Sequence, residues 1–218
     1  MADFDVTPRN ELRRYPKRGS YDKSVIYPIL DEGLVCHVGF AIEGEPFVIP
    51  TIHARQGDTL LLHGLKGGRM LGHIEAGHTV CVTVTLVDAL VMARSVFNHS
   101  MNFRSVVLYG RGKAITEPSA KMEALRVLTE HVARGRWAEA RQPNEKEVKQ
   151  TTIVAIDIES ATAKVRQGPP GDDDEDLGHP VWAGLLPLPM LPQTPIRDPK
   201  QGEDIPVPAY LADYRRPG

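Results

Sequence analysis

The sequence has few of the features that mark specialised classes of protein. Only two of its 218 residues are cysteines, Cys36 and Cys81, which excludes a disulfide framework or a Cys-x-x-Cys metal site. Both stand in apolar stretches, which predicts small buried side chains. No apolar stretch approaches the ~18 residues that a membrane-spanning helix needs, and the first residues lack the apolar segment of a signal peptide. We therefore expect a reduced, cytoplasmic protein without a membrane partner.

Charge and motifs exclude further classes. The chain has 26 Lys and Arg against 28 Asp and Glu, a formal net charge of −2, so we expect no nucleic-acid partner. The basic run at residues 13–18 is interpreted as part of a solvated arm. The Gly-x-Gly-x-x-Gly, P-loop, Gly-x-Ser-x-Gly and His-Glu-x-x-His motifs are all missing, which argues against a Rossmann site, a P-loop, a serine hydrolase and a zinc protease. No metal site is predicted.

Hydrophobic periodicity predicts a strand-rich domain with a few helices. Helical spacing and helix-ending glycines favour helices at residues 22–32, 67–76 and 117–135. Alternation and β-branched residues favour strands at residues 34–42, 47–54, 59–63, 78–87, 103–116 and 151–158, the last of which can continue to Val165. This order predicts an α+β fold, mainly β, built on an antiparallel sheet or barrel.

The composition divides the chain into three parts. Residues 1–20 are interpreted as an N-terminal arm, residues 21–167 as the domain and residues 168–218 as an extension. The extension holds 11 of the 18 prolines and an acidic run at residues 172–176, so no helix or barrel strand is predicted there. Its apolar segment 181–188 predicts packing across the domain or a partner subunit.

The segment from residue 60 to residue 69 has the composition of an anion site. Three leucines lead into His63 and Gly64, and a glycine-rich turn with Lys66 and Arg69 then opens a helix. Glycine lets backbone N–H groups approach an anion, and the two cations add full charges. The segment therefore predicts a phosphate site, although surface turns often have the same composition.

A second segment, residues 94–105, mixes hydroxyls, amides, guanidiniums and apolar side chains just before a strand. Such a mixture suits the carbonyl and N–H edge of an aromatic ring. An ordinary polar connection between strands is the alternative.

The strings FVIPTIHAR, LLLHGLKGGRM and SVFNHSMNFRSVVLYGRGKAIT together resemble the pyridoxamine 5′-phosphate oxidase-like split-barrel family, in its nitroimidazole-resistance-type branch. The resemblance covers about residues 20–166. It implies a six-stranded FMN-binding split β-barrel with flanking helices and a homodimer with FMN at the interface. The cofactor-binding residues that it implies are Val48, Pro50, Thr51, His53, His63, Gly64, Lys66, Arg69, Ser100, Asn102, Arg104 and Ser105, with Lys66 and Arg69 at the phosphate and the last four near the flavin, from the same or the second subunit.

The sequence departs from true pyridoxamine phosphate oxidases at two places. Those enzymes have an Arg-Lys pair after a serine at the helix start, where this chain has Lys66-Gly67-Gly68-Arg69. Their C-terminal Arg-x-His pattern is also missing from the proline-rich extension. The resemblance therefore does not extend to vitamin B6 oxidation.

The leading functional hypothesis is an FMN-dependent oxidoreductase, nitroreductase-like, with a small-molecule substrate and NAD(P)H as a candidate electron donor. His53 and His63 are the candidate proton donors because histidine titrates near neutral pH; a packed or ring-positioning role is the alternative for both. Two other functions stay open. One is a flavin-binding carrier or sensor without turnover, and the other is a haem-binding protein with His99 or His179 as axial ligand.

Overall fold

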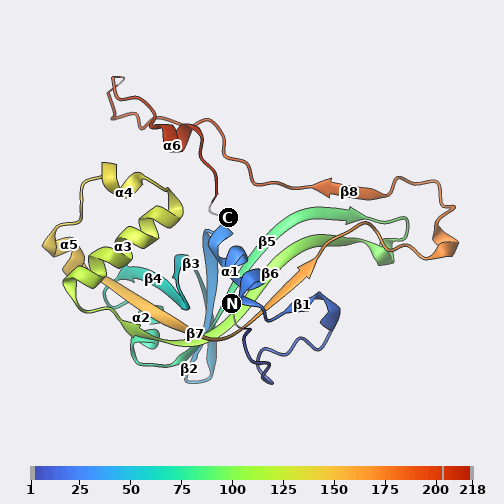
Figure 1. The fold of residues 1–218 in the computed structure, drawn as a ribbon, viewed down its shortest axis with the longest axis horizontal. Helices are drawn as coiled ribbons and strands as arrows, with labels where there is room; N and C mark the ends of the chain where they lie inside the picture. The colour runs from blue at the N-terminus through green and yellow to red at the C-terminus, as the bar shows by residue number, and fades with distance from the viewer. Residues whose placement is uncertain (1–2, 203, 217–218) are drawn as a thin grey trace.

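The computed structural model describes residues 3–202 and 204–216, and six of its strands close into a ring (Figure 1). Around the ring the order is β7, β4, β3, β2, β5 and β6, and β6 pairs with β7 to complete it; every pair is antiparallel. The predicted split β-barrel is therefore confirmed. The bounds of the ring strands are β2 (Val35–Ile42), β3 (Glu45–Gln56), β4 (Thr59–Leu65), β5 (Thr79–Met92), β6 (Ser100–Ala114) and β7 (Thr151–Arg166).

The β2–β3 hairpin shows how local sequence sets the register. Its two-residue turn, Glu43 and Gly44, has φ values of 51° and 86°, the left-handed backbone that tight hairpin turns require. This turn sets Phe40 opposite Phe47, and their rings stack with centroids 5.4 Å apart. The predicted hairpin is confirmed; β2 ends at Ile42 as expected, and β3 begins at Glu45, closer to the turn than the alternation alone indicated.

Helix α1 (Lys23–Glu32) closes one end of the barrel, where Ile26 and Leu30 are fully buried. The side chain of Asp22 caps the helix by accepting a hydrogen bond from the backbone N–H of Ser24 at 2.7 Å. Pro28 lies inside the helix but on its exposed side. Water can therefore satisfy the carbonyl that proline leaves without a partner, which explains how the predicted helix continues.

Apolar side chains pack into two groups inside the domain. The larger fills the barrel and includes Leu60, Leu62 and Ile74. The smaller lies between the sheet and α3 (Pro118–Val132), where Leu61 and Leu128 meet. The remaining short helices are α2 (Arg69–Glu75), α4 (Arg136–Glu139), α5 (Glu145–Gln150) and α6 (Ala209–Ala212), with 3₁₀ turns η1 (Pro16–Arg18), η2 (Val96–Asn98) and η3 (Asp174–Asp176).

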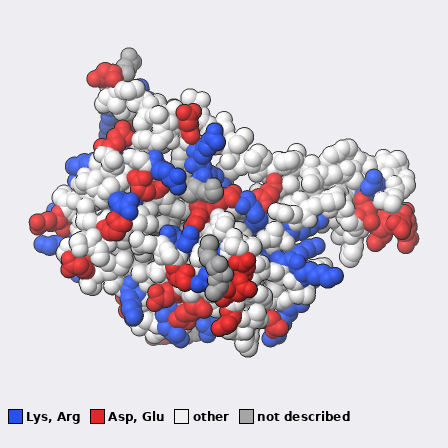
Figure 2. Space-filling model, viewed as in Figure 1, with Lys and Arg blue, Asp and Glu red and all other residues white. Residues whose placement is uncertain are grey.

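Strands β5 and β6 run on beyond the ring as a projecting arm, to which the C-terminal extension adds β8 (Gly184–Pro187) (Figure 1). A two-residue strand, β1 (Gly19–Ser20), pairs with β7 at the base. Figure 2 shows acidic side chains gathered at the far end of the arm, where the run 172–176 lies. There Asp172 pairs with Arg94, with Oδ2 3.0 Å from Nη1.

The prediction that the extension contains no helix was wrong, because it includes the helical turn α6; it also contains a strand, β8, that the sequence did not predict. Strand β8 lies outside the barrel ring and pairs with the edge of β5 from Ala89 to Met92. The four residues of β8, the last of which is a proline, form too short a pattern to predict a strand. The free edge of β5 supplies their hydrogen-bond partners. Among the described residues, no helix is long and apolar enough to cross a membrane.

Candidate functional site

Strand β3 changes its partner at His53. Up to Ile52 it pairs with β2, and from His53 to Gln56 it pairs with β4. Strand β4 meanwhile follows β7 from Thr59 to Leu65. The first half of β3 and the last residues of β4 therefore diverge, and within residues 3–202 and 204–216 no strand pairs with β3 on that side before His53. Backbone N–H and C=O groups of β3 are left there for another partner.

The outer face of β3 is apolar and open. Since residues in register share a face and alternate along a strand, the pairing of Ala54 with Leu61 sets Val48, Pro50, Ile52 and His63 on one face. Val48 is 66% exposed and Ile52 39% exposed. We call these four residues the outer face; it offers a flat apolar surface beside unpaired backbone groups.

The turn after β4 lies at one end of this face. Gly64 faces helix α2 so closely that a Cβ atom there would lie 3.0 Å from Cδ1 of Leu71. A larger residue at this position would need the tip of Leu71 to shift, so glycine allows the close approach of β4 and α2. The backbone N–H of Lys66 donates to the carbonyl of Gln150 at 3.0 Å, and Gly67 has a φ of 85°. The structure therefore contains the glycine-rich turn that the sequence predicts, and Lys66 and Arg69 lie on it.

Two exposed cations stand at this turn. The guanidinium of Arg69 lies 4.6 Å from the ring centroid of Phe47 on β3, which joins the start of α2 to the start of β3. Within the part of the chain that the structure describes, neither Lys66 nor Arg69 forms an ion pair. Their charges are therefore free for an anionic ligand.

His53 lies on the inner side of β3 and is fully buried. Its Nε2–H donates to the carbonyl of Leu30 at 2.9 Å, and its ring lies 5.4 Å from that of His131. Burial lowers the pKa of His53 from its ordinary value of 6.5 to about 4. A neutral imidazole without solvent contact favours the packing role over that of a proton donor.

His63 lies on the outer face and is half-buried. Burial lowers the pKa of His63, and its Nδ1 is buried without a hydrogen-bond partner among the described residues. Thr51 lies on the inner side of β3 and is half-buried. Of the two candidate histidines, His63 is the one that faces the region of the predicted ligand.

The other predicted group lies on β6, away from the turn after β4 in the same chain (Figure 1). The guanidinium of Arg104 is held by Glu32 and Asp88, the latter with Oδ1 at 2.8 Å, and these carboxylates raise the pKa of Arg104. Asn102 accepts from Arg166 and donates to the carbonyl of Gly168 at 3.2 Å. Ser105 donates to the carbonyl of Lys164 at 3.4 Å, and Ser100 is exposed. One chain therefore does not bring all twelve residues together.

Four residues near the turn escaped the sequence analysis: Ile52, Leu65, Lys146 and Lys149. Leu65 is 80% exposed, although its sequence position suggested only the end of a strand. Both lysines belong to α5, whose Asn144 and Glu147 form a capping box. That Asn-x-x-Glu spacing signals a helix start, but nothing in the sequence places α5 beside Lys66.

The sequence profile of the family described as pyridoxamine 5′-phosphate oxidase matches residues 22–165. Flavocytochrome Anf3 from Azotobacter vinelandii is 38% identical, with 96% of this chain and 98% of that chain covered and a TM-score of 0.89. The FAD and haem binding protein from Mycobacterium smegmatis is 32% identical, with 89% and 95% covered and a TM-score of 0.85.

A candidate 5-nitroimidazole antibiotic resistance protein from Bacteroides thetaiotaomicron shares the fold, at 24% identity with 67% of this chain and 86% of that chain covered and a TM-score of 0.59. No protein of curated function matches the chain. The chain belongs to the pyridoxamine 5′-phosphate oxidase family, which confirms the resemblance drawn from its sequence.

The burial of His53 makes folding stability depend on pH. The folded state keeps His53 neutral down to a pKa of about 4, whereas the unfolded chain takes up a proton below about 6.5. The free energy of unfolding should therefore fall by up to about 3 kcal/mol as pH drops from about 6.5 to 4. Urea titrations at a series of pH values measure this, and His53→Gln should make the decrease shallower. An exposed control, His99→Gln, should keep the full slope; equal slopes in all three proteins would contradict the assignment.

Proposed function

We propose that the protein is a homodimeric flavoprotein that holds the FMN moiety of its cofactor, either FMN or that half of FAD, against the outer face of β3. The supporting observation is the combination of this exposed apolar face with two exposed cations at its end, Lys66 and Arg69, which form no ion pair within the described part of the chain. A flavin has the complementary parts: a flat ring with an edge of hydrogen-bonding groups, and a phosphate.

The residues fit this group in three respects. Val48, Pro50 and Ile52 offer apolar contact to a ring, and the unpaired edge of β3 offers backbone donors and acceptors. Lys66 and Arg69 match a phosphate in charge and lie on the turn that follows Gly64. Contacts between surface cations and a phosphate contribute only a few kcal/mol to the binding free energy, whereas micromolar affinity requires about −8 kcal/mol. The apolar contact with the ring must therefore supply the rest.

We further propose an oxidoreductase that reduces small molecules, with NAD(P)H as electron donor, in the cytoplasm. A bound flavin supplies hydride and electron transfer. The chain's part is to bind and orient the ring and to exclude water from its covered face, and His63 is the group in position to hold or give a proton there. A screen of NADH- and NADPH-driven reduction of nitroaromatics and quinones distinguishes this from a carrier or sensor, which would show no turnover.

Exposed apolar side chains support a dimer. On the arm and the extension they include Val96 at 86%, Phe97 at 91% and Trp182 at 69% exposure. Apolar surface of this extent on a projecting element is typical of an interface. A second copy would cover it and would bring Ser100 and Asn102 of its own arm toward the flavin.

Two of the relatives are called a flavocytochrome and an FAD and haem binding protein. These names support a flavin in this chain, and they support a haem as a second cofactor. His99 is the better of the two candidate axial ligands. Its Nδ1–H donates to the carbonyl of Ser95 at 2.9 Å, which leaves the Nε2 lone pair free, as in many metal-ligating histidines. Val96 and Phe97 beside it are exposed and suit an apolar macrocycle.

Changing Lys66 and Arg69 together to Ala should weaken FMN binding by about 10- to 100-fold, because two charge-assisted contacts to the phosphate are lost. Quenching of flavin fluorescence during titration of the apoprotein measures the affinity. The exposed residue Lys200 serves as control, and Lys200→Ala should bind FMN as the unchanged protein does. Unaltered affinity in the double variant would remove these cations from the phosphate site.

Replacing Trp182 by Ala should weaken dimerisation, since the residue's exposed ring would otherwise be buried by the second copy. Sedimentation velocity over a dilution series measures the dimer dissociation constant, for which we expect an increase of about tenfold or more. The matched control is Val6→Ala, which shortens an exposed apolar side chain in the N-terminal segment. A protein that stays monomeric at all concentrations and still binds flavin fully would rule out a shared site.

The absorbance spectrum of the protein purified with haem supplied should show a Soret band in addition to the two flavin bands. His99→Ala should remove or shift the Soret band and leave the flavin bands unchanged, because it removes the axial nitrogen alone. The parallel variant His179→Ala is the control. If His179→Ala alone changes the band, His99 is not the ligand, and if no Soret band forms at all, the haem proposal fails.

A further inference from the structure

Arg166, the last residue of β7, is a buried charge without a counter-charge. It is only 9% exposed, yet no carboxylate within residues 3–202 and 204–216 pairs with it, and its Nε is buried without a hydrogen-bond partner there. Its guanidinium donates only to neutral groups: the side chain of Asn102 and the carbonyls of Gly168 and Pro169, the latter two at 3.3 and 3.4 Å. Arginine is almost never buried unless it is paired. The position therefore indicates an anion that comes from outside the chain.

More positive charge lies on the same side of β7. Lys164 stands two residues before Arg166, so that both belong to one face of the strand. Strand β1 pairs with Lys164 through Gly19, which brings the 3₁₀ turn before it, η1, beside β7. Burial and the nearby charge of Arg18 lower the pKa of Arg166. Like charges held this close repel each other, and an anion beside them would relieve the repulsion.

The ring of Tyr15 gathers three of these cations. The guanidinium carbons of Arg18 and Arg14 lie 4.5 and 5.4 Å from the ring centroid, and Nζ of Lys164 lies 6.0 Å from it. Attraction to the ring holds the cations together without neutralising them. None of the three forms an ion pair in the part of the chain that the structure describes. We call Arg14, Arg18, Lys164 and Arg166 the basic cluster.

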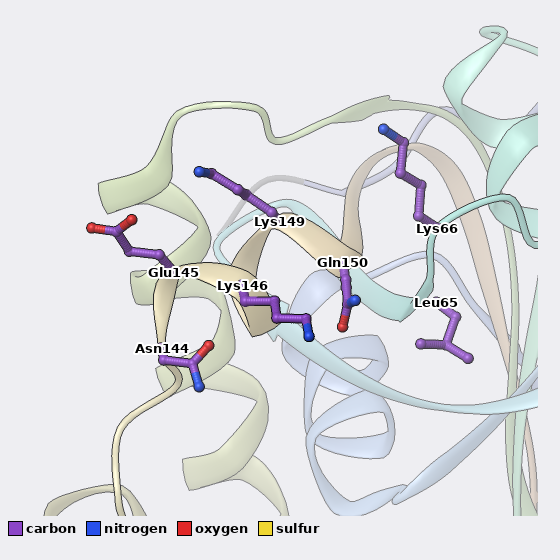
Figure 3. A pocket seen from close by; sticks show the side chains of 7 residues that line it. All are labelled: Leu65, Lys66, Asn144, Glu145, Lys146, Lys149 and Gln150. Carbon is purple, nitrogen blue, oxygen red and sulfur yellow. The ribbon is translucent and has the colours of Figure 1, made fainter.

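The lysines beside the turn after β4 provide a comparison. Lys66, Lys146 and Lys149 line an open groove of about 910 Å³ between that turn and α5 (Figure 3). All three are exposed, so water solvates their charges. In the basic cluster Arg166 has lost most of that solvation. The basic cluster therefore gains more from an anionic partner than the lysines of the groove do.

The chain carries an acidic segment of matching charge at the far end of its arm. Asp173, Asp174 and Glu175 are exposed, and none of them forms an ion pair with a described residue. Asp172, by contrast, is held by Arg94. Figure 2 shows acidic side chains at the far end of the arm and basic ones below it, in the region where Figure 1 places β1. The acidic segment and the basic cluster thus have opposite charges and different places on the arm.

We propose that the acidic segment of a second copy, residues 173–175, docks on the basic cluster. The inference rests on the proposed homodimer and names the contact that orients its two copies. A two-fold axis makes such a contact twice, since each copy offers both surfaces. The exposed rings of Phe97 and Trp182 belong to the same end of the arm as the acidic segment, and Tyr15, 51% exposed, stands in the basic cluster. One contact therefore buries aromatic surface and pairs charges around it, as protein interfaces commonly do.

Charge reversal on either surface tests this contact. Arg14→Glu/Arg18→Glu should raise the dimer dissociation constant about tenfold or more, because acidic groups then face each other at both contacts of the dimer. Asp173→Lys/Glu175→Lys should have the same effect, because basic groups then face each other. Sedimentation velocity over a dilution series measures the constant. For the unchanged protein it should rise as salt is raised from about 50 to about 500 mM, since exposed charges are screened.

A mixture of the two variants tests whether the contact is formed between chains. In a mixed dimer the reversed basic cluster of one chain faces the reversed acidic segment of the other, and the two unchanged surfaces also face each other. The equimolar mixture should therefore regain a dissociation constant close to that of the unchanged protein. A contact within one chain would not be restored by mixing, because each variant chain keeps one reversed and one unchanged surface.

The matched control is Lys146→Glu/Lys149→Glu, which reverses the same number of charges on α5. Its dimer dissociation constant should equal that of the unchanged protein. Circular dichroism spectra identical to that of the unchanged protein show that all the variants are folded.

The possible failures can be told apart. If the unchanged protein is a dimer whose dissociation constant ignores both reversals, or if the mixture stays as weak as its components, the charged contact is wrong and the proposed homodimer stands. If the unchanged protein is monomeric at every concentration, both are wrong. If Arg14→Glu/Arg18→Glu loses binding to polyglutamate while its dimer is unaffected, the basic cluster serves a different acidic partner, and the contact between copies is again wrong.

Discussion

At His53, strand β3 leaves β2 and joins β4, and the hydrogen bond from His53 to the carbonyl of Leu30 holds α1 against this junction. Strands β3 and β4 are therefore hydrogen-bonded to each other from His53 to Gln56, whereas they separate along residues 45–52 of β3. This change of partner has three consequences: the free edge of β3, the exposed side chains of the outer face, and the divergence of the end of β4 from β3. A neutral, buried imidazole suits the junction because it can donate to the helix carbonyl without bringing a charge into the interior.

Cations in this protein fall into two groups according to what surrounds them. Arg104 is compensated by Glu32 and Asp88 and ties α1 to the base of the arm. Among the residues that the structure describes, no carboxylate pairs with Lys66 or Arg69, and both side chains are exposed at the glycine turn. Arginines and lysines look alike in a sequence, and only the fold decides which charges are used internally and which are left for a ligand.

Much of the architecture could be predicted from the sequence because it depends on local patterns. The helix at residues 22–32, the hairpin around Gly44 and the strand running into the glycine turn were all found from periodicity and glycine positions. The position of α5 beside Lys66 could not be predicted, because it depends on the pairing of β4 with β7, whose paired residues, from Leu65 with Thr151 to Thr59 with Asp157, are far apart in the sequence. The role of Arg104 was hidden for the same reason, since its partners lie on α1 and β5.

Strand β8 was missed because four residues carry almost no periodic signal, yet its position has a consequence for assembly. It covers the edge of β5 from Ala89 to Met92, beyond the residues that pair with β2. An uncovered edge of that length would recruit strands from other molecules. The extension continues from Pro187 to Pro189, and proline has no N–H to offer a further strand. The short, proline-bounded β8 therefore makes the edge of the arm a poor template for pairing with a strand of another molecule.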